Sequence, residues 1–276
     1  MTTFQGPRKR LPENPSEENL RKQAKRLASQ EDLQLAVAQR RLAGEYGYKN
    51  WAELMRAVAS RFVPLVPLRG LVAFPHEVYP IYIGRRKSIR AIDAAGIPET
   101  PISLTAKTPI LLVAQRDETI AEPSAADMYE VGTLGVIVEH QRLPDGSVKI
   151  MVEGKKRAKV SRFVFDQKFF KAEVEEVADT ERLNPLDIGL SRLGLPQPLS
   201  NDHARALWRS VLSALNNYTR VKRKTVLVRE LEDPGILPYM VARHLNIELA
   251  EQQALLETVN PVERLERILG HLETAN

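Results

Sequence analysis

The chain has 276 residues, of which 43% are hydrophobic and 27% charged, a composition that is ordinary for a globular protein with room for two domains. It contains no cysteine, which excludes disulfides, thiolate metal sites and cysteine nucleophiles. The net charge of +5 lies entirely in residues 1–61, where twelve Lys and Arg residues stand against seven Asp and Glu residues. The remaining residues carry equal numbers of acidic and basic side chains.

The sequence shows no secretory leader and no membrane segment. The first twenty residues are polar and charged, without the apolar centre of a signal peptide. No apolar run approaches the roughly 20 residues that a membrane helix needs. We therefore expect a cytoplasmic protein.

Residues 1–61 predict a small, basic, all-α module. Asn14-Pro15-Ser16-Glu17 is typical of a capped helix start, because Asn can cap, Pro fits the first turn and Glu can reach back to the cap. A second helical pattern covers residues 33–46, and Asn50-Trp51-Ala52-Glu53 begins a third. Charge and hydrophobic period both change near Arg61, which predicts a domain boundary there.

Short strands dominate the next part of the chain. Residues 62–66 and 79–83 predict strands whose prolines suggest edges or bulges, and residues 110–114 predict a buried strand. A short helix is expected over residues 88–95, followed by a proline-containing loop at 97–108.

A hairpin is the clearest local pattern. Residues 128–160 alternate apolar and polar side chains on either side of Leu143-Pro144-Asp145-Gly146, which predicts the turn. Two sets of alternate residues share a face: Leu134, Val136 and Val138, and then Val148, Ile150 and Val152. A further strand is expected after Gly154 and another over residues 171–177, so residues 62–182 predict a closed or nearly closed, mostly antiparallel β-barrel.

Residues 183–276 predict a helical bundle that begins after a linker or packed loop at 183–200. From Asn201 the apolar residues return to helical spacing: Ala204, Leu207, Trp208, Val211, Leu212 and Leu215. Asp233-Pro234 and Asn260-Pro261 are each typical of a helix cap followed by a first-turn proline. Together with residues 249–257 these segments predict the bundle.

The basic run Gly154-Lys155-Lys156-Arg157 is not a phosphate loop. In the phosphate-loop pattern Lys149 stands in place of the first glycine and Lys156 in place of the hydroxyl residue. We interpret Gly154 as a β-bulge or tight turn between two strands, with the lysines in solvent. The five histidines lack metal-site spacing and no Gly-x-Ser-x-Gly motif is present, so we expect no catalytic, cofactor or metal site.

Lys22, Lys25 and Arg26 share one face of the first helix, opposite Leu20 and Leu27. Such a stripe can neutralise phosphates and is a candidate anion or nucleic-acid site, although a solvated helix face has the same pattern. Two further basic clusters lie in the same module, Arg8-Lys9-Arg10 and Arg40-Arg41. The clusters of the later chain carry less weight because acidic residues balance them: Arg85-Arg86-Lys87, Lys155-Lys156-Arg157 and residues 220–224.

Four blocks resemble the N-terminal, substrate-binding domain of the ATP-dependent protease Lon. They are "FVPLVPLRGLVAFPHEVYPIYIGRRKSI" (62–89), "PILLVAQRD" (109–117), "YEVGTLGVIVEHQRLPDGSVKIMVEGKKRAKV" (129–160) and "LPYMVARHLNIELAEQQALLETVNPVERLERIL" (237–269). The resemblance implies an α+β protein with a PUA-like barrel followed by a helical bundle. It also implies recognition of unfolded or tagged polypeptides.

Several residues match the motif of that family. For Gly132, Gly154 and Arg157 we expect structural roles, the glycines in backbone geometry and Arg157 in tying strands together. The Phe74-Pro75 pair is expected to plug the mouth of the barrel. As candidate polypeptide-binding residues the resemblance offers Phe74, Pro75, Tyr79 and Tyr82.

The favoured hypothesis is a non-catalytic polypeptide- or degron-binding protein. A full Lon protease also has ATPase and Ser/Lys peptidase modules, whose motifs this sequence does not contain, so we expect no enzyme activity. One alternative is a nucleic-acid-binding protein that uses the basic module and the PUA-like barrel. The other is an accessory subunit or fragment of an ATP-dependent Lon protease.

Overall fold

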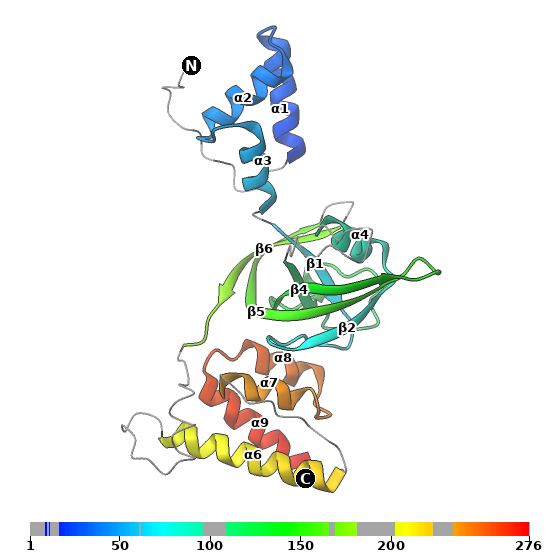
Figure 1. The fold of residues 1–276 in the computed structure, drawn as a ribbon, viewed down its shortest axis with the longest axis vertical. Helices are drawn as coiled ribbons and strands as arrows, with labels where there is room; N and C mark the ends of the chain where they lie inside the picture. Colours follow the sequence, from blue (N-terminus) through cyan, green and yellow to red (C-terminus); the bar gives the residue numbers. More distant parts are fainter. Residues whose placement is uncertain are drawn as a thin grey trace. The chain divides into compact units, whose positions relative to one another are not determined.

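The structure is a computed structural model that describes Lys9, Leu11 and residues 17–60, 62–95, 109–165, 169–180, 202–222 and 234–275. It divides into two compact units, Met1–Val63 and Pro64–Asn276 (Figure 1). Four predicted features lie outside the described residues: the helix caps at Asn14 and Asp233, the loop at 97–108 and the linker at 183–200.

The described part of the first unit contains three helices: α1 (Glu17–Gln30), α2 (Leu35–Glu45) and α3 (Trp51–Ser60). Its core is formed by apolar side chains of all three helices: Leu20, Ala24, Leu42, Ala43, Leu54 and Val58. The predicted cap of α3 is present, because the side-chain oxygen of Asn50 accepts a hydrogen bond from the backbone N–H of Glu53 at 2.8 Å. Gly47 adopts a φ of +83° between α2 and α3, a backbone conformation that favours glycine.

Within the described residues, six strands form one sheet, which begins at the boundary between the units: β1 (Val63–Leu68), β2 (Val78–Ile83), β3 (Ile110–Ala114), β4 (Val131–Arg142), β5 (Val148–Phe165) and β6 (Phe170–Val177). Their order is β2-β5-β4-β3-β1-β6, and β5 also pairs with β6, so the sheet closes into a barrel (Figure 1). The β1–β3 pair is parallel, and the β2–β5, β3–β4, β4–β5 and β5–β6 pairs are antiparallel. Two short helices accompany the strands: α4 (Arg86–Ala94) and η1 (Ala125–Asp127).

The proline-containing strands occupy different positions. Among the described strands, β2 pairs with β5 alone and lies at the end of the strand order. In contrast, β1 lies between β3 and β6, so the expectation of an edge is wrong for this strand. Pro67 of β1 stands opposite Val113 in the parallel ladder.

β5 runs without interruption through Gly154, so the prediction of a junction between two strands is wrong. Leu134 pairs with Lys156 and Gly135 with Gly154, which leaves Lys155 as the extra residue of a β-bulge. A Cβ atom on Gly154 would lie 2.3 Å from the carbonyl oxygen of Phe74. The glycine is therefore required by a close backbone approach rather than by a turn.

The predicted hairpin turn is confirmed. The backbone N–H of Leu143 donates to the carbonyl of Ser147 at 2.9 Å, and Gly146 has a φ of +82°. The predicted inward face of β5 is also confirmed: Val148, Ile150 and Val152 are buried. On β4 a register shift between Ile137 and Glu139 leaves Val138 44% exposed, while Ile137 packs against the barrel core.

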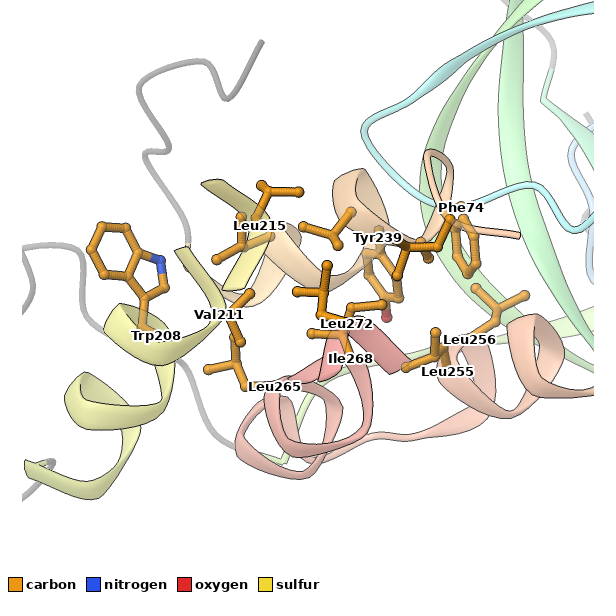
Figure 2. Packing of buried hydrophobic residues seen from close by; sticks show 14 of the residues in the cluster. Phe74, Trp208, Val211, Leu215, Tyr239, Leu255, Leu256, Leu265, Ile268 and Leu272 are labelled. Atoms are coloured by element: carbon orange, nitrogen blue, oxygen red, sulfur yellow. The ribbon is translucent and has the colours of Figure 1, made fainter. Parts of the chain in front are cut away.

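The helical bundle contains α6 (Asp202–Lys222), η2 (Pro234–Ile236), α7 (Leu237–Ala242), α8 (Leu249–Glu257) and α9 (Pro261–Ala275). Figure 2 shows its core, in which α6 and α9 contribute most of the labelled side chains: Trp208, Val211, Leu215, Leu265, Ile268 and Leu272. The predicted cap at Asn260 is present, since its side-chain oxygen accepts from the N–H of Val262 at 2.9 Å. Over the described ranges, no helix combines the length and apolarity needed to cross a membrane.

Candidate functional site

Phe74 and Pro75 lie inside the fold. Phe74 is 1% exposed, and its ring stacks on that of Tyr239 in α7, with 5.1 Å between ring centroids and 19° between ring planes (Figure 2). Its backbone N–H donates a hydrogen bond to the hydroxyl of Tyr79 at 2.9 Å. Phe74 thus joins the barrel to the bundle.

The two candidate tyrosines of β2 point in opposite directions. Tyr79 is 4% exposed, and burial raises the pKa of its hydroxyl far above the usual value. Tyr82 is 67% exposed. Of the four residues named from the resemblance, Tyr82 is the one with a broadly accessible side chain, and a polypeptide-binding role for this set stays a prediction.

The outward side chains of β2 form an apolar strip, which we call the β2 strip: Val78, Pro80 and Tyr82. Their partners on β5 are Glu153, Met151 and Lys149. The ammonium group of Lys149 lies 5.7 Å from the ring centroid of Tyr82. Since β2 is an edge strand among those described, the strip combines exposed apolar side chains with a strand edge.

A groove of about 400 Å³ opens next to this strip, and we call it the β1–β2 groove. Its apolar lining comes from β1, β2 and the loop after β1: Val66, Pro67, Leu68, Leu71, Pro80, Ile81, Tyr82 and Ile83. Gly84, Ser88 and two arginines, Arg69 and Arg85, complete the lining. A larger depression of about 770 Å³ lies between α6 and α9, but serines, asparagines and charged residues form most of its lining.

Arg157 ties the barrel to the helical bundle. One guanidinium nitrogen donates to the carbonyl oxygen of Thr258 at 2.7 Å, just after α8, and the other to the carboxylate of Asp179. Arg264 of α9 binds both oxygens of the same carboxylate at 2.7 Å and donates to the Tyr239 hydroxyl at 2.6 Å. Sequence reasoning proposed a strand-tying role for Arg157 but missed Asp179 and Arg264, because no local pattern marks either residue.

The basic residues singled out from the sequence lie in different settings. Lys22, Lys25 and Arg26 are exposed on α1, on the side opposite the buried Leu20 and Ala24. Lys155 and Lys156 are exposed on β5, as expected, and form ion pairs with Glu153 and Glu176. A role of the α1 stripe in anion binding stays a prediction.

The fold and the site together define the class: an α+β protein in which a mostly antiparallel, closed barrel is followed by a helical bundle. The model of the ATP-dependent protease La (LON) substrate-binding domain matches residues 63–274. The chain therefore belongs to this family. The matched residues correspond to the substrate-binding domain of Lon rather than to its catalytic domains.

Relatives and solved structures agree with the family. Lon protease of Azospirillum brasilense is 34% identical over 215 residues, which cover 76% of this chain and 24% of that protein. Lon protease 1 of Myxococcus xanthus is 37% identical over 211 residues, covering 75% and 23%. The chain thus spans about a quarter of the length of the curated relatives it matches.

The N-terminal domain of Mycobacterium avium complex Lon protease shares the fold, with a TM-score of 0.55 and 20% sequence identity. The alignment covers 77% of this chain and 98% of that one. The predicted α+β fold class is confirmed. None of these comparisons supports nucleic-acid binding, which stays an alternative prediction.

Proposed function

We propose that this chain binds unfolded or tagged polypeptides in an extended conformation and does not itself cleave them. The observation that carries the proposal is the β2 strip, in which an edge strand presents Val78, Pro80 and Tyr82 outward beside an apolar groove. An extended chain can add main-chain hydrogen bonds at a strand edge while its alternate side chains occupy apolar pockets. Membership of the Lon substrate-binding family supports the same conclusion.

We further propose that the chain has neither ATPase nor peptidase activity and that it acts in the cytoplasm, either alone or together with a Lon-type protease. The printed sequence has no Gly-x-x-x-x-Gly-Lys-Ser/Thr motif. We expect the purified chain neither to hydrolyse ATP nor to cleave casein. Nucleotide-dependent proteolysis that stays with the chain through stringent washing would contradict this part of the proposal.

The binding function is tested by fluorescence anisotropy with a labelled, reduced and unfolded model protein. Binding to an apolar surface should persist at ~0.3 M salt, where surface charges are screened. We expect Tyr82→Ser to weaken binding about fivefold, because burial of the tyrosine ring against the bound polypeptide would contribute ~1 kcal/mol to the binding free energy. The matched control is Val221→Ser on α6, which removes an exposed apolar side chain, 54% accessible, from a different surface.

Two results would overturn the proposal. One is equal binding by Tyr82→Ser and the wild-type chain. The other is that the chain does not bind unfolded protein, while its residues 64–276 bind RNA with an affinity that falls steeply as the salt concentration rises. The second result would favour the nucleic-acid alternative.

A further inference from the structure

Two guanidinium groups meet at the polar end of the β1–β2 groove. Arg69 directly follows β1, and Arg85 lies two residues after β2. Nη2 of Arg69 donates to the carbonyl oxygen of Ile120 at 3.2 Å, and Nη2 of Arg85 donates to the same oxygen at 3.3 Å. The side-chain amide of Gln115 is a third donor to that carbonyl, at 3.1 Å. Two positive charges thus converge on one neutral acceptor.

This pair of arginines carries positive charge that no directly bound carboxylate balances. Within the described ranges, neither Arg69 nor Arg85 forms an ion pair, and Nη1 of Arg85 is buried without a hydrogen-bond partner. Two carboxylates lie in the same region, but Glu122 pairs with Lys87 at 2.6 Å and Glu118 lies against Gly70. Burial lowers the pKa of Arg85 and the neighbouring Arg69 lowers it further, while the charge of Glu122 partly opposes the shift.

The start of α4 adds to the positive potential. Arg85 is the N-cap residue of this nine-residue helix, and its side chain makes no capping hydrogen bond. The first-turn N–H groups of a helix favour a negative group nearby. Ser88, in that first turn, is buried and lines the groove. The helix start and the two arginines therefore favour a negative group at the same end of the groove.

We infer that the Arg69–Arg85 end of the β1–β2 groove binds the carboxylate of an Asp or Glu side chain in an extended polypeptide, while a neighbouring apolar side chain lies against Pro80 and Tyr82. A guanidinium fork matches a carboxylate in shape and charge, which makes arginine the usual partner for this group. The apolar lining suits the adjacent residue, and about 400 Å³ is within the size range of ligand pockets. This inference rests on the proposed polypeptide-binding function. It adds a preference for bound polypeptides in which an acidic residue is next to an apolar one.

The test measures the binding of three labelled peptides of about ten residues to the full chain by fluorescence anisotropy. The first peptide has an apolar residue next to a central Glu and an amidated C-terminus. The second replaces that Glu by Gln, and the third is this neutral peptide with a free C-terminal carboxylate. We expect the acidic peptide to bind about tenfold more tightly than the neutral one, a difference of about 1.4 kcal/mol.

The variants separate a defined site from general attraction. Arg69→Gln should abolish the preference for the acidic peptide and leave the affinity for the neutral peptide unchanged, which also shows that the variant is folded. Arg69 is exposed, so its replacement is not expected to disturb the core. The matched control is Arg90→Gln, which makes the same charge change at an exposed position of α4 outside the groove lining and should keep the preference.

The outcomes distinguish this inference from the proposed function. Equal affinity of the wild-type chain for the acidic and neutral peptides would overturn the inference and leave polypeptide binding standing. An equal loss of preference in Arg69→Gln and Arg90→Gln would overturn it as well, because net charge alone would then explain the effect. Tightest binding of the peptide with the free C-terminus would assign the arginines to chain ends and refute the side-chain assignment. Failure of all three peptides to bind would contradict the proposed function itself.

Discussion

The charge cluster that joins the barrel to the bundle makes a quantitative prediction for Asp179→Asn. Asp179 is the one carboxylate that the structure shows bound to both Arg157 and Arg264, whose side chains are 4% and 1% exposed. Arg264 binds both of its oxygens at 2.7 Å. Neutralising Asp179 removes a negative charge that two buried guanidinium groups share, while the arginines remain in place.

The expected loss is about 3 kcal/mol of unfolding free energy. Breaking a buried ion pair by removing one partner costs about 3–5 kcal/mol, because the remaining charge is uncompensated. The lower end applies because the side chain of Asp179 is 27% exposed and water can screen part of the change. Hydrogen bonds from the arginines to the carbonyl of Thr258 and the hydroxyl of Tyr239 remain and limit the loss further. For a unit of this size, ~3 kcal/mol lowers Tm by roughly 6–12 °C.

The assay is urea and thermal unfolding followed by the fluorescence of Trp208 in a Trp51→Phe background. Trp208 is buried in the bundle, and the sequence contains only these two tryptophans, so the signal reports the second unit alone. The matched control is Glu176→Gln, whose carboxylate pairs with Lys156 on the surface, both side chains being about 60% exposed. This control should change stability by less than about 0.5 kcal/mol. A loss of unfolding free energy below ~1 kcal/mol for Asp179→Asn would refute the role assigned to the Arg157–Asp179–Arg264 cluster.

Two further predictions concern backbone packing and alkaline stability. Gly154→Ala should lower the free energy of urea unfolding by about 1–3 kcal/mol, because the new Cβ would meet the carbonyl oxygen of Phe74. Gly270→Ala in α9 is the control: nothing lies within 4 Å of its Cβ position, so it should stabilise by about 0.5–1 kcal/mol. Equal effects of the two substitutions would contradict the close approach at Gly154. Folding raises the pKa of Tyr79 above its unfolded value near 10, so its contribution to stability is complete below that pH and declines as pH rises further, when the unfolded state loses the proton first. Tyr79→Phe should therefore lower the free energy of unfolding by about 1–3 kcal/mol at neutral pH, since the N–H of Phe74 loses its acceptor. It should also make the free energy of unfolding fall less steeply between about pH 9 and pH 11. A variant with the same pH dependence as the wild-type chain in this range would contradict the role assigned to Tyr79.

Local pattern was enough to predict most of the elements. The alternation at Val148, Ile150 and Val152 and the helical spacing at Trp208, Val211 and Leu215 depend on neighbours in the chain, and each set is buried as the pattern requires. Turn and cap chemistry is local as well, which is why the Leu143–Gly146 turn and the caps at Asn50 and Asn260 could be located. The same patterns predicted a barrel and a bundle, and the resemblance to the Lon family implied both.

Local pattern failed where a distant part of the chain determines the geometry. Gly154 was interpreted as a β-bulge or tight turn between two strands. The β-bulge is present at the neighbouring Lys155, but the strand is continuous, and the glycine is required because the carbonyl of Phe74, eighty residues earlier, packs against it. Phe74 and Tyr79 had the chemistry of surface binding residues, yet the bundle and the barrel bury them.

The sequence by itself determined the helices, the strands, their turns and the family, because each of these follows from side chains close together in the chain or from blocks that can be compared directly. Tertiary structure alone decided which residues meet. Closing the barrel brings Arg69 and Arg85 to the carbonyl of Ile120, and docking the bundle brings Arg157 and Arg264 to Asp179. These charges interact over a few ångströms in space but over 16 to 107 residues of chain, and no local periodicity records such a distance.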